Sequence, residues 1–107
     1  MILIYSLIGC PFSENGEKLL KEINHEVIKI NHDEKQKWNV INGMTTYPQI
    51  FYRKSNGDKI KIGGYTELNS IMDKIKASTD KNNILQEIQN FLNINEKDAK
   101  RILVSLF

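Results

Sequence analysis

The sequence predicts an α/β protein with a four-stranded mixed sheet flanked by helices and an extra C-terminal helical pair. Three observations support this fold class. Short apolar runs alternate with segments of helical spacing over residues 1–77. The pair Asn56-Gly57 separates the last two strand-like runs, as is typical of a tight hairpin. Residues 78–107 carry two amphipathic helical patterns and no strand pattern.

The first half of the chain predicts a strand, a helix and a second strand. Residues 1–8 are apolar and β-branched, which is typical of a strand buried on both faces. A helix is expected over residues 11–24, with Gly16 as a weak point. Residues 25–31 form the second strand. It should run parallel to the first, because the intervening helix supplies a right-handed crossover.

The second half begins with a helix over residues 33–42, which Gly43 ends. Residues 48–54 and 59–62 form a hairpin, with Lys59 and Lys61 on its solvated side. A helix over residues 65–77 follows a Gly-Gly turn.

Two helical segments end the chain. The first carries apolar residues over 84–92, and the second begins at an Asn95 cap. We expect one domain over residues 1–77, with residues 78–107 as a helical extension packed on that domain. The alternatives for the extension are a dimer interface and a docking surface for another protein.

Composition narrows the function classes. The 107 residues include 15 Lys and Arg and 13 Asp and Glu, with no basic stripe, so nucleic-acid binding is not expected. The apolar start has no basic lead and is too short to span a membrane. We therefore expect a soluble cytoplasmic protein without a membrane partner. His25 and His32 are expected in surface loops, without metal-ligand spacing.

Cys10 is the only cysteine, so an intramolecular disulfide is excluded and any partner thiol must come from another molecule. It lies between the first strand and the first helix. The unpaired N–H groups of a helix's first turn stabilise a thiolate, and Pro11 suits that turn because no N–H is needed there. From position alone, a reactive thiol and a buried structural cysteine both stay open.

Two further segments suggest a binding site. Pro48 precedes a strand, where it suits a sharp turn and can be cis. If the first and third strands are neighbours, Tyr47 lies beside Cys10 and its backbone is free to pair with a bound peptide. The alternative is an ordinary edge proline. The N–H groups of residues 65–67 open a helix and suit a carboxylate, although a plain turn capped by Thr66 is the alternative.

The segments CPFS at 10–13, TTYPQIF at 45–51 and IGGYTEL at 62–68 together resemble the glutaredoxins in order and spacing. The resemblance covers residues 1–77 and implies the thioredoxin-like fold of that family. It implies a glutathione-dependent thiol–disulfide oxidoreductase with Cys10 as the nucleophile, within an active-site motif completed by Pro11, Phe12 and Ser13. It also implies that glutathione is bound by Phe12, Thr46, Tyr47, Pro48, Gly64, Tyr65, Thr66 and Glu67.

Ser13 stands where dithiol members of that family have their second cysteine, so the resemblance implies a monothiol mechanism. Cys10 would attack the glutathione sulfur of a glutathionylated protein or of a low-molecular-weight disulfide. Free glutathione would then reduce the enzyme. For the Ser13 hydroxyl we expect a helix cap, in preference to a hydrogen bond to the thiolate.

Two departures from the family pattern leave alternatives open. A second monothiol group carries Cys-Gly-Phe-Ser and binds a [2Fe–2S] cluster between two subunits with glutathione as co-ligand. Pro11 replaces that glycine here, which favours thiol exchange by a monomer, with a cluster-binding homodimer ligated by Cys10 as the alternative. Leu7 stands where a Lys or Arg is usual, which predicts weaker glutathione binding and makes a redox-inactive binding module a further alternative. Lys35 and Lys37 are candidate compensating contacts to a glutathione carboxylate, or residues of a solvated helix face.

Overall fold

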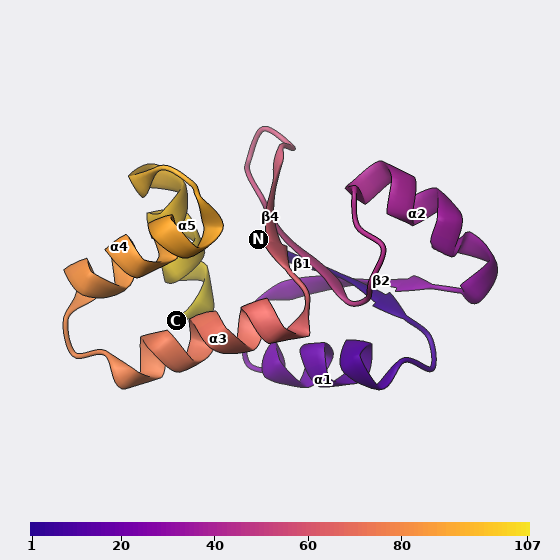
Figure 1. Ribbon diagram of the computed structural model, residues 1–107, viewed down its shortest axis with the longest axis horizontal. Helices are drawn as coiled ribbons and strands as arrows, with labels where there is room; N and C mark the ends of the chain where they lie inside the picture. Colours follow the sequence, from indigo (N-terminus) through magenta and orange to yellow (C-terminus); the bar gives the residue numbers. More distant parts are fainter.

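Four strands form one mixed sheet in the order β2-β1-β3-β4 in the computed structural model, which describes residues 1–107 (Figure 1). The first strand, β1 (Ile2–Leu7), runs parallel to β2 (His25–Ile30) and antiparallel to β3 (Gln49–Arg53). The strand β4 (Lys59–Gly63) completes the hairpin with β3. The predicted parallel pair is confirmed, and the first and third strands are neighbours.

Five helices and one short 3-10 turn accompany the sheet, and the predicted fold class is confirmed. The helices are α1 (Pro11–Leu19), α2 (Lys35–Asn42), α3 (Tyr65–Ala77), α4 (Lys81–Leu92) and α5 (Glu96–Leu106), and the 3-10 turn η1 (His32–Glu34) precedes α2. Gly43 ends α2 in the left-handed conformation, at φ 64°, as predicted.

The prediction for the first helix was wrong at its C-terminal end. The helix ends at Leu19 rather than near Asn24. The N–H groups of Leu20 and Lys21 donate to the carbonyls three residues earlier, at 3.2 and 3.3 Å. These tighter turns lead the chain back to β2. His25 is the first residue of β2, which agrees with the predicted strand and not with the predicted loop position, and its Nδ1 lies 2.6 Å from the Ile23 carbonyl.

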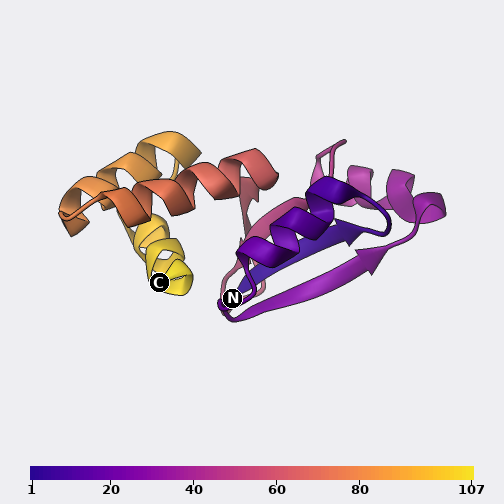
Figure 2. The same ribbon diagram turned by 90° about the horizontal axis from the view of Figure 1, so that it is seen from below.

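Strand β1 is buried along its whole length because both faces of the sheet are covered. On one face, Ile2, Ile4 and Ile50 belong to a cluster with Leu20 and with residues of α3. On the other face, Leu3, Tyr5, Leu7, Ile30 and Phe51 pack with Trp38 of α2. Figure 2 shows α1 in front of the sheet and α2 behind it.

The two lysines of β4 are exposed, as predicted for the solvated side of the strand, and each ammonium also makes hydrogen bonds within the protein. The Lys61 ammonium donates to the Gly43 carbonyl at 3.0 Å and so caps the C-terminal end of α2. The Lys59 ammonium donates to the Tyr5 hydroxyl at 2.9 Å and to Asn42 Oδ1 at 3.0 Å. Both cations therefore attach α2 to the sheet.

The C-terminal helices share the apolar cluster of the α1–α3 face of the sheet. Their buried members are Ile84, Ile88, Ala99, Ile102, Leu103 and Leu106. Asp98 of α5 pairs with Lys54 of the β3–β4 hairpin at 3.3 Å. The predicted Asn95 cap is confirmed, since its side chain accepts from the Asp98 N–H at 2.8 Å. A division between residues 77 and 78 stays a prediction.

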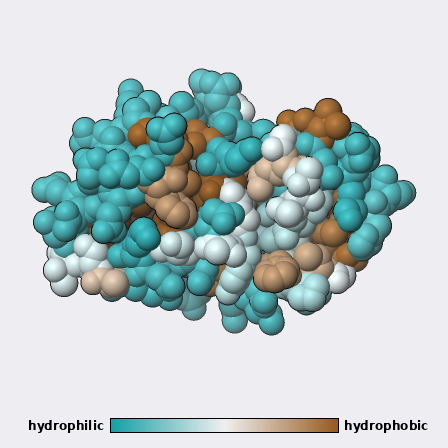
Figure 3. Space-filling view, in the orientation of Figure 1, coloured by the Kyte–Doolittle hydropathy of each residue, from teal (hydrophilic) through white to brown (hydrophobic).

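The outer surface of these helices is partly apolar. Phe91, Val104 and Phe107 are exposed, and Figure 3 shows apolar surface among hydrophilic residues over the helical half of the molecule. None of the five helices combines the length and the apolar character needed to cross a bilayer.

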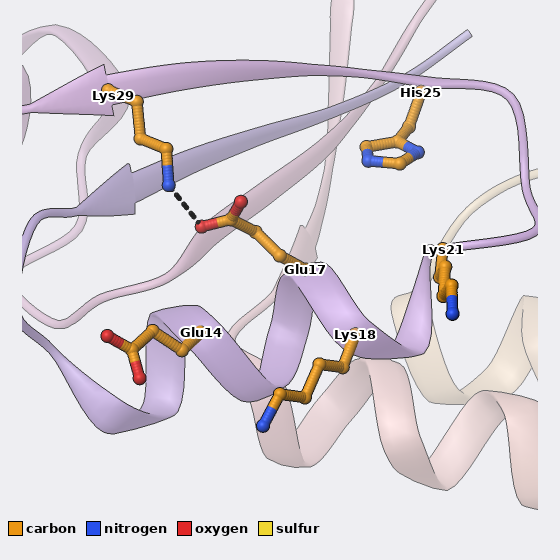
Figure 4. A pocket seen from close by; sticks show the side chains of 6 residues that line it. All are labelled: Glu14, Glu17, Lys18, Lys21, His25 and Lys29. Atoms are coloured by element: carbon orange, nitrogen blue, oxygen red, sulfur yellow. Dashed lines mark hydrogen bonds and ion pairs between the residues drawn. The ribbon is translucent and has the colours of Figure 1, made fainter.

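A polar cleft of about 470 Å³ lies between α1 and β2 (Figure 4). The Lys29 ammonium donates to Glu17 Oε2 at 2.8 Å, and the Ser6 hydroxyl donates to the same oxygen. Burial alone would raise the pKa of Glu17, but the hydrogen bonds from Lys29 and Ser6 outweigh it and hold the pKa below its usual value of 4.5. Glu17 therefore joins α1 to both strands beneath it.

This ion pair predicts a small acid sensitivity. Because the pKa of Glu17 is lowered by folding, its stabilisation is complete above pH 4.5 and is lost as the pH falls further. Lys29 is more than half exposed, so Glu17→Gln should cost less than about 1 kcal/mol at pH 7. Urea midpoints measured from about pH 7 to 3 should fall less steeply for the variant than for the wild type. If the midpoints of both proteins fell equally with pH, the ionised Glu17 would not be stabilising the fold.

Candidate active site

Cys10 is the N-cap residue of α1, one tight turn after β1. Its N–H donates to the Leu7 carbonyl at 3.2 Å, and its own carbonyl accepts from Glu14 at 3.0 Å. The N–H groups of Phe12 and Ser13 have no backbone acceptor, as is usual in the first turn of a helix. The side chain of Cys10 is half-buried, so the thiol is placed at a positive helix end with access from solvent.

The Ser13 hydroxyl does not cap α1, and that prediction was wrong. Ser13 is fully buried, and its Oγ accepts from the Leu7 N–H at 3.0 Å. The cap position belongs to Cys10, whose side chain makes no capping hydrogen bond. Ser13 instead ties the end of β1 to the first turn of α1, which fixes the turn that carries the thiol.

Tyr47 lies beside the thiol, and the peptide bond between Tyr47 and Pro48 is cis. The Tyr47 carbonyl oxygen is 4.0 Å from Cys10 Sγ, and neither its N–H nor its carbonyl makes a backbone hydrogen bond. The ring is buried, and its hydroxyl donates to the Lys35 carbonyl at 3.3 Å. This burial raises the pKa of Tyr47. The side chain thus anchors the segment and leaves the peptide group without a backbone hydrogen bond.

The start of α3 supplies the third part of the site. Glu67 Oε1 accepts from the Gly64 N–H at 2.6 Å, so the cap is formed by Gly64 and Glu67 and not by Thr66. The N–H groups of residues 65–67 have no acceptor in the protein. They remain available for an anion at the positive end of a 13-residue helix.

A groove of about 290 Å³ lies between the first turn of α1, the Tyr47 segment and the start of α3. Cys10 does not line it but lies at its side, against the Tyr47 carbonyl. The lining of the groove consists of Phe12, Thr46, Tyr47, Gly64, Tyr65, Thr66 and Glu67. The rings of Phe12 and Tyr65 lie 6.3 Å apart across it. All seven are residues singled out from the sequence. Of the residues predicted to bind glutathione, Pro48 does not line the groove; it is buried, and its ring lies against Gly16 of α1.

The predicted lysine contacts are not part of this lining. The Lys37 ammonium lies 5.2 Å from the centre of the Trp38 ring, and Lys35 contributes its carbonyl to Tyr47. Leu7 is buried in an apolar cluster against which Cys10 packs. The surroundings of the thiol on that side are therefore apolar.

Two glycines matter for the site in ways that the sequence did not reveal. A Cβ on Gly16 would lie 3.0 Å from Pro48 Cγ and 3.1 Å from Ile4 Cδ1, so a glycine lets α1 approach β1 and Pro48 closely. Gly63 has a φ of 129°, and a Cβ there would lie 2.7 Å from Glu67 Cγ. The sequence predicts that Gly16 weakens the helix, and the close contact with Ile4 and Pro48 explains why a glycine is nevertheless needed there.

Gly63→Ala should damage the groove because the methyl group displaces the Glu67 side chain from the Gly64 N–H. We expect a loss of about 1–3 kcal/mol in the free energy of unfolding, from backbone strain and the lost cap. Gly57→Ala is a matched control, since Gly57 also has a positive φ but an open surrounding. Urea unfolding of both variants tests this. An equal loss for both would show that the Glu67 clash contributes nothing.

Comparison with known proteins extends these observations. No known family model matches the sequence, and no curated protein matches it. Among solved structures, a wheat glutaredoxin superposes with a TM-score of 0.52 at 22% sequence identity, over 67% of this chain and 68% of that chain. The fold is that of a glutaredoxin. The thioredoxin-like architecture implied by the sequence is thereby confirmed.

Proposed function

We propose that this protein is a glutathione-dependent thiol–disulfide oxidoreductase that works by a monothiol mechanism. One observation carries the proposal: three segments distant in the sequence converge on a groove beside Cys10. Each segment offers a different chemistry, namely a thiol at a helix start, a free backbone peptide and the open N–H groups of α3.

These groups suit a γ-glutamyl tripeptide. The N–H groups of residues 65–67 would bind the carboxylate of the γ-glutamyl end. The free N–H and carbonyl of Tyr47 would pair with the backbone of the glutathione cysteine, as in an added strand. The two rings of Phe12 and Tyr65 would cover the peptide between these points. In this arrangement the glutathione sulfur is held next to Cys10 Sγ.

The reaction consists of two thiol–disulfide exchanges. The Cys10 thiolate attacks the glutathione sulfur of a mixed disulfide, the old S–S bond breaks, and the protein thiolate leaves and takes up a proton. A second glutathione thiolate then attacks the enzyme-bound glutathione sulfur, which releases Cys10 and oxidised glutathione. The second glutathione is required because the chain has no other cysteine.

A glutathionylated peptide, glutathione, glutathione reductase and NADPH together form the direct assay. We expect NADPH oxidation to depend on the protein and to saturate with the peptide. A rate no higher than that without protein would contradict the proposed function. Visible absorbance of protein purified without oxygen and with glutathione distinguishes this function from the cluster-binding homodimer, which would be a coloured dimer.

Leu7→Lys should improve the use of glutathione. A lysine here can extend along the apolar cluster with its ammonium at the surface near Cys10. A cation near a bound carboxylate contributes up to about 1 kcal/mol, so the KM for the glutathionylated peptide should fall by about fivefold or less. Leu7→Gln controls for polarity without charge. An equal fall in that variant, or a fall that persists at high salt, would contradict a charge effect.

A further inference from the structure

Gln49 is a fully buried polar side chain to which the proposed reaction gives no role. It is the first residue of β3 and directly follows Pro48. Side chains with amides are mostly exposed in proteins, and a buried one requires hydrogen-bond partners. Its partners therefore show what it holds.

Both ends of the Gln49 amide contact the segment that leads from α2 to the groove. Its oxygen accepts from Asn42 Nδ2 at 2.9 Å. Its nitrogen donates to the Met44 carbonyl at 3.2 Å and lies 3.2 Å from Oδ1 of Asn39. Gln49 thus fixes the end of α2 and the backbone of Met44, three residues before Tyr47.

The network continues to a cation on β4. The Lys59 ammonium, which donates to Asn42 Oδ1 at 3.0 Å, also lies 5.0 Å from the centres of the Tyr5 and Phe51 rings. A charged donor strengthens the hydrogen bonds of a buried chain. The side chains therefore run from Lys59 through Asn42 and Gln49 to the backbone of Met44.

We propose that Gln49 is a positioning residue that sets the Tyr47 peptide for binding of the glutathionyl group. Residues 44–47 are held at three points: the Met44 N–H donates to the Asn39 carbonyl at 3.3 Å, Gln49 donates to the Met44 carbonyl, and the Tyr47 hydroxyl donates to the Lys35 carbonyl. Residues 45–47 make no backbone–backbone hydrogen bond, so losing the bond from Gln49 leaves Met44 held only by its N–H and lets Tyr47 shift relative to Cys10. The expected change in KM rests on the proposed function. The expected shift of the Tyr47 peptide does not.

The kinetic test uses Gln49→Met, which keeps an unbranched side chain and removes all hydrogen bonds of the amide. We expect the KM for a glutathionylated peptide to rise by about two- to tenfold, the range that one hydrogen bond accounts for. The kcat and the rate of Cys10 alkylation by iodoacetamide should change by less than about twofold, because neither depends on the initial docking. A KM equal to that of the wild type would overturn the proposal.

Asn95→Ala is the matched control for general destabilisation, since it removes a hydrogen-bonded cap on α5, far along the chain from the groove. Its KM should remain unchanged. An equal rise in both variants would show that lost stability, and not positioning, is responsible. If Gln49→Met does not fold, Gln49→Leu replaces it: this side chain also lacks the amide that donates to Met44, so the same rise is expected.

A second readout separates this proposal from the proposed function. In two-dimensional amide NMR spectra, Gln49→Met should shift the Thr46 and Tyr47 resonances, and Asn95→Ala should leave them in place. Unshifted resonances would overturn the positioning role even if the enzyme were active. If the wild-type protein lacks turnover but the Thr46 and Tyr47 resonances still shift in Gln49→Met, the positioning role is supported although the proposed function fails.

Discussion

Cys10→Ser is expected to reduce turnover of a glutathionylated peptide by about a thousandfold or more, because a serine hydroxyl is not ionised near neutral pH and does not attack a disulfide. Oxygen replaces sulfur at a half-buried position without changing the neighbouring hydrogen bonds of Leu7 and Ser13. The fold and the groove should therefore persist. The assay with glutathione reductase and NADPH measures the loss directly.

Mass spectrometry supplies an independent control for this variant. Wild-type protein mixed with oxidised glutathione should gain one glutathione per chain, and Cys10→Ser should gain none, since Cys10 is the only cysteine. The variant should still bind S-methylglutathione, which needs the groove and not the thiol. Turnover that persists in the variant would remove Cys10 from the mechanism altogether.

Ile102→Ala is expected to lower the free energy of unfolding by about 2–5 kcal/mol, the usual cost of truncating a fully buried isoleucine. Ile102 of α5 is fully buried in the cluster that includes Ile2, Ile4 and Ile50 of the sheet. A loss of this size should be global, because the cavity opens in a core shared by helices and sheet. Urea unfolding should show one transition, seen equally by far-ultraviolet circular dichroism and by Trp38 fluorescence.

Val104→Ala is the matched control, because Val104 lies on the same helix but is 69% exposed. Its effect should stay within about 0.5 kcal/mol. The two probes also test whether α4 and α5 unfold together with the sheet. If Ile102→Ala produced an early transition in circular dichroism while Trp38 fluorescence remained native, α4 and α5 would form a separate unit.

The order of elements could be predicted from the sequence because periodicity and turn residues are local signals. Strand β1 is a continuous apolar run, and Gly43 and Asn95 mark helix ends by their own backbone and capping chemistry. The end of α1 could not be predicted in this way. Leu20 and Ile23 continue the helical spacing, but their backbone follows tighter turns into β2.

The groove could be predicted in outline because its residues lie in three short motifs whose topology brings them together. The roles of Ser13, Lys59 and Gly63 could not, because each depends on a partner elsewhere in the fold. The Leu7 N–H, the Asn42 amide and the Glu67 side chain are those partners. A single serine, lysine or glycine forms no periodic sequence pattern, so the sequence does not show which distant residue it will contact.

The close approach of α1 to Pro48 has a consequence for recognising distant relatives. The thiol is carried by α1 and the peptide group beside it by the Tyr47–Pro48 segment, and the spacing between them depends on the lack of a side chain at Gly16. Sequence drift can alter the charged residues around such a groove without separating its two halves, whereas a larger residue at this one helical position would. Divergent chains with this chemistry should therefore be sought by a small residue six positions after the cysteine, together with a proline before the third strand.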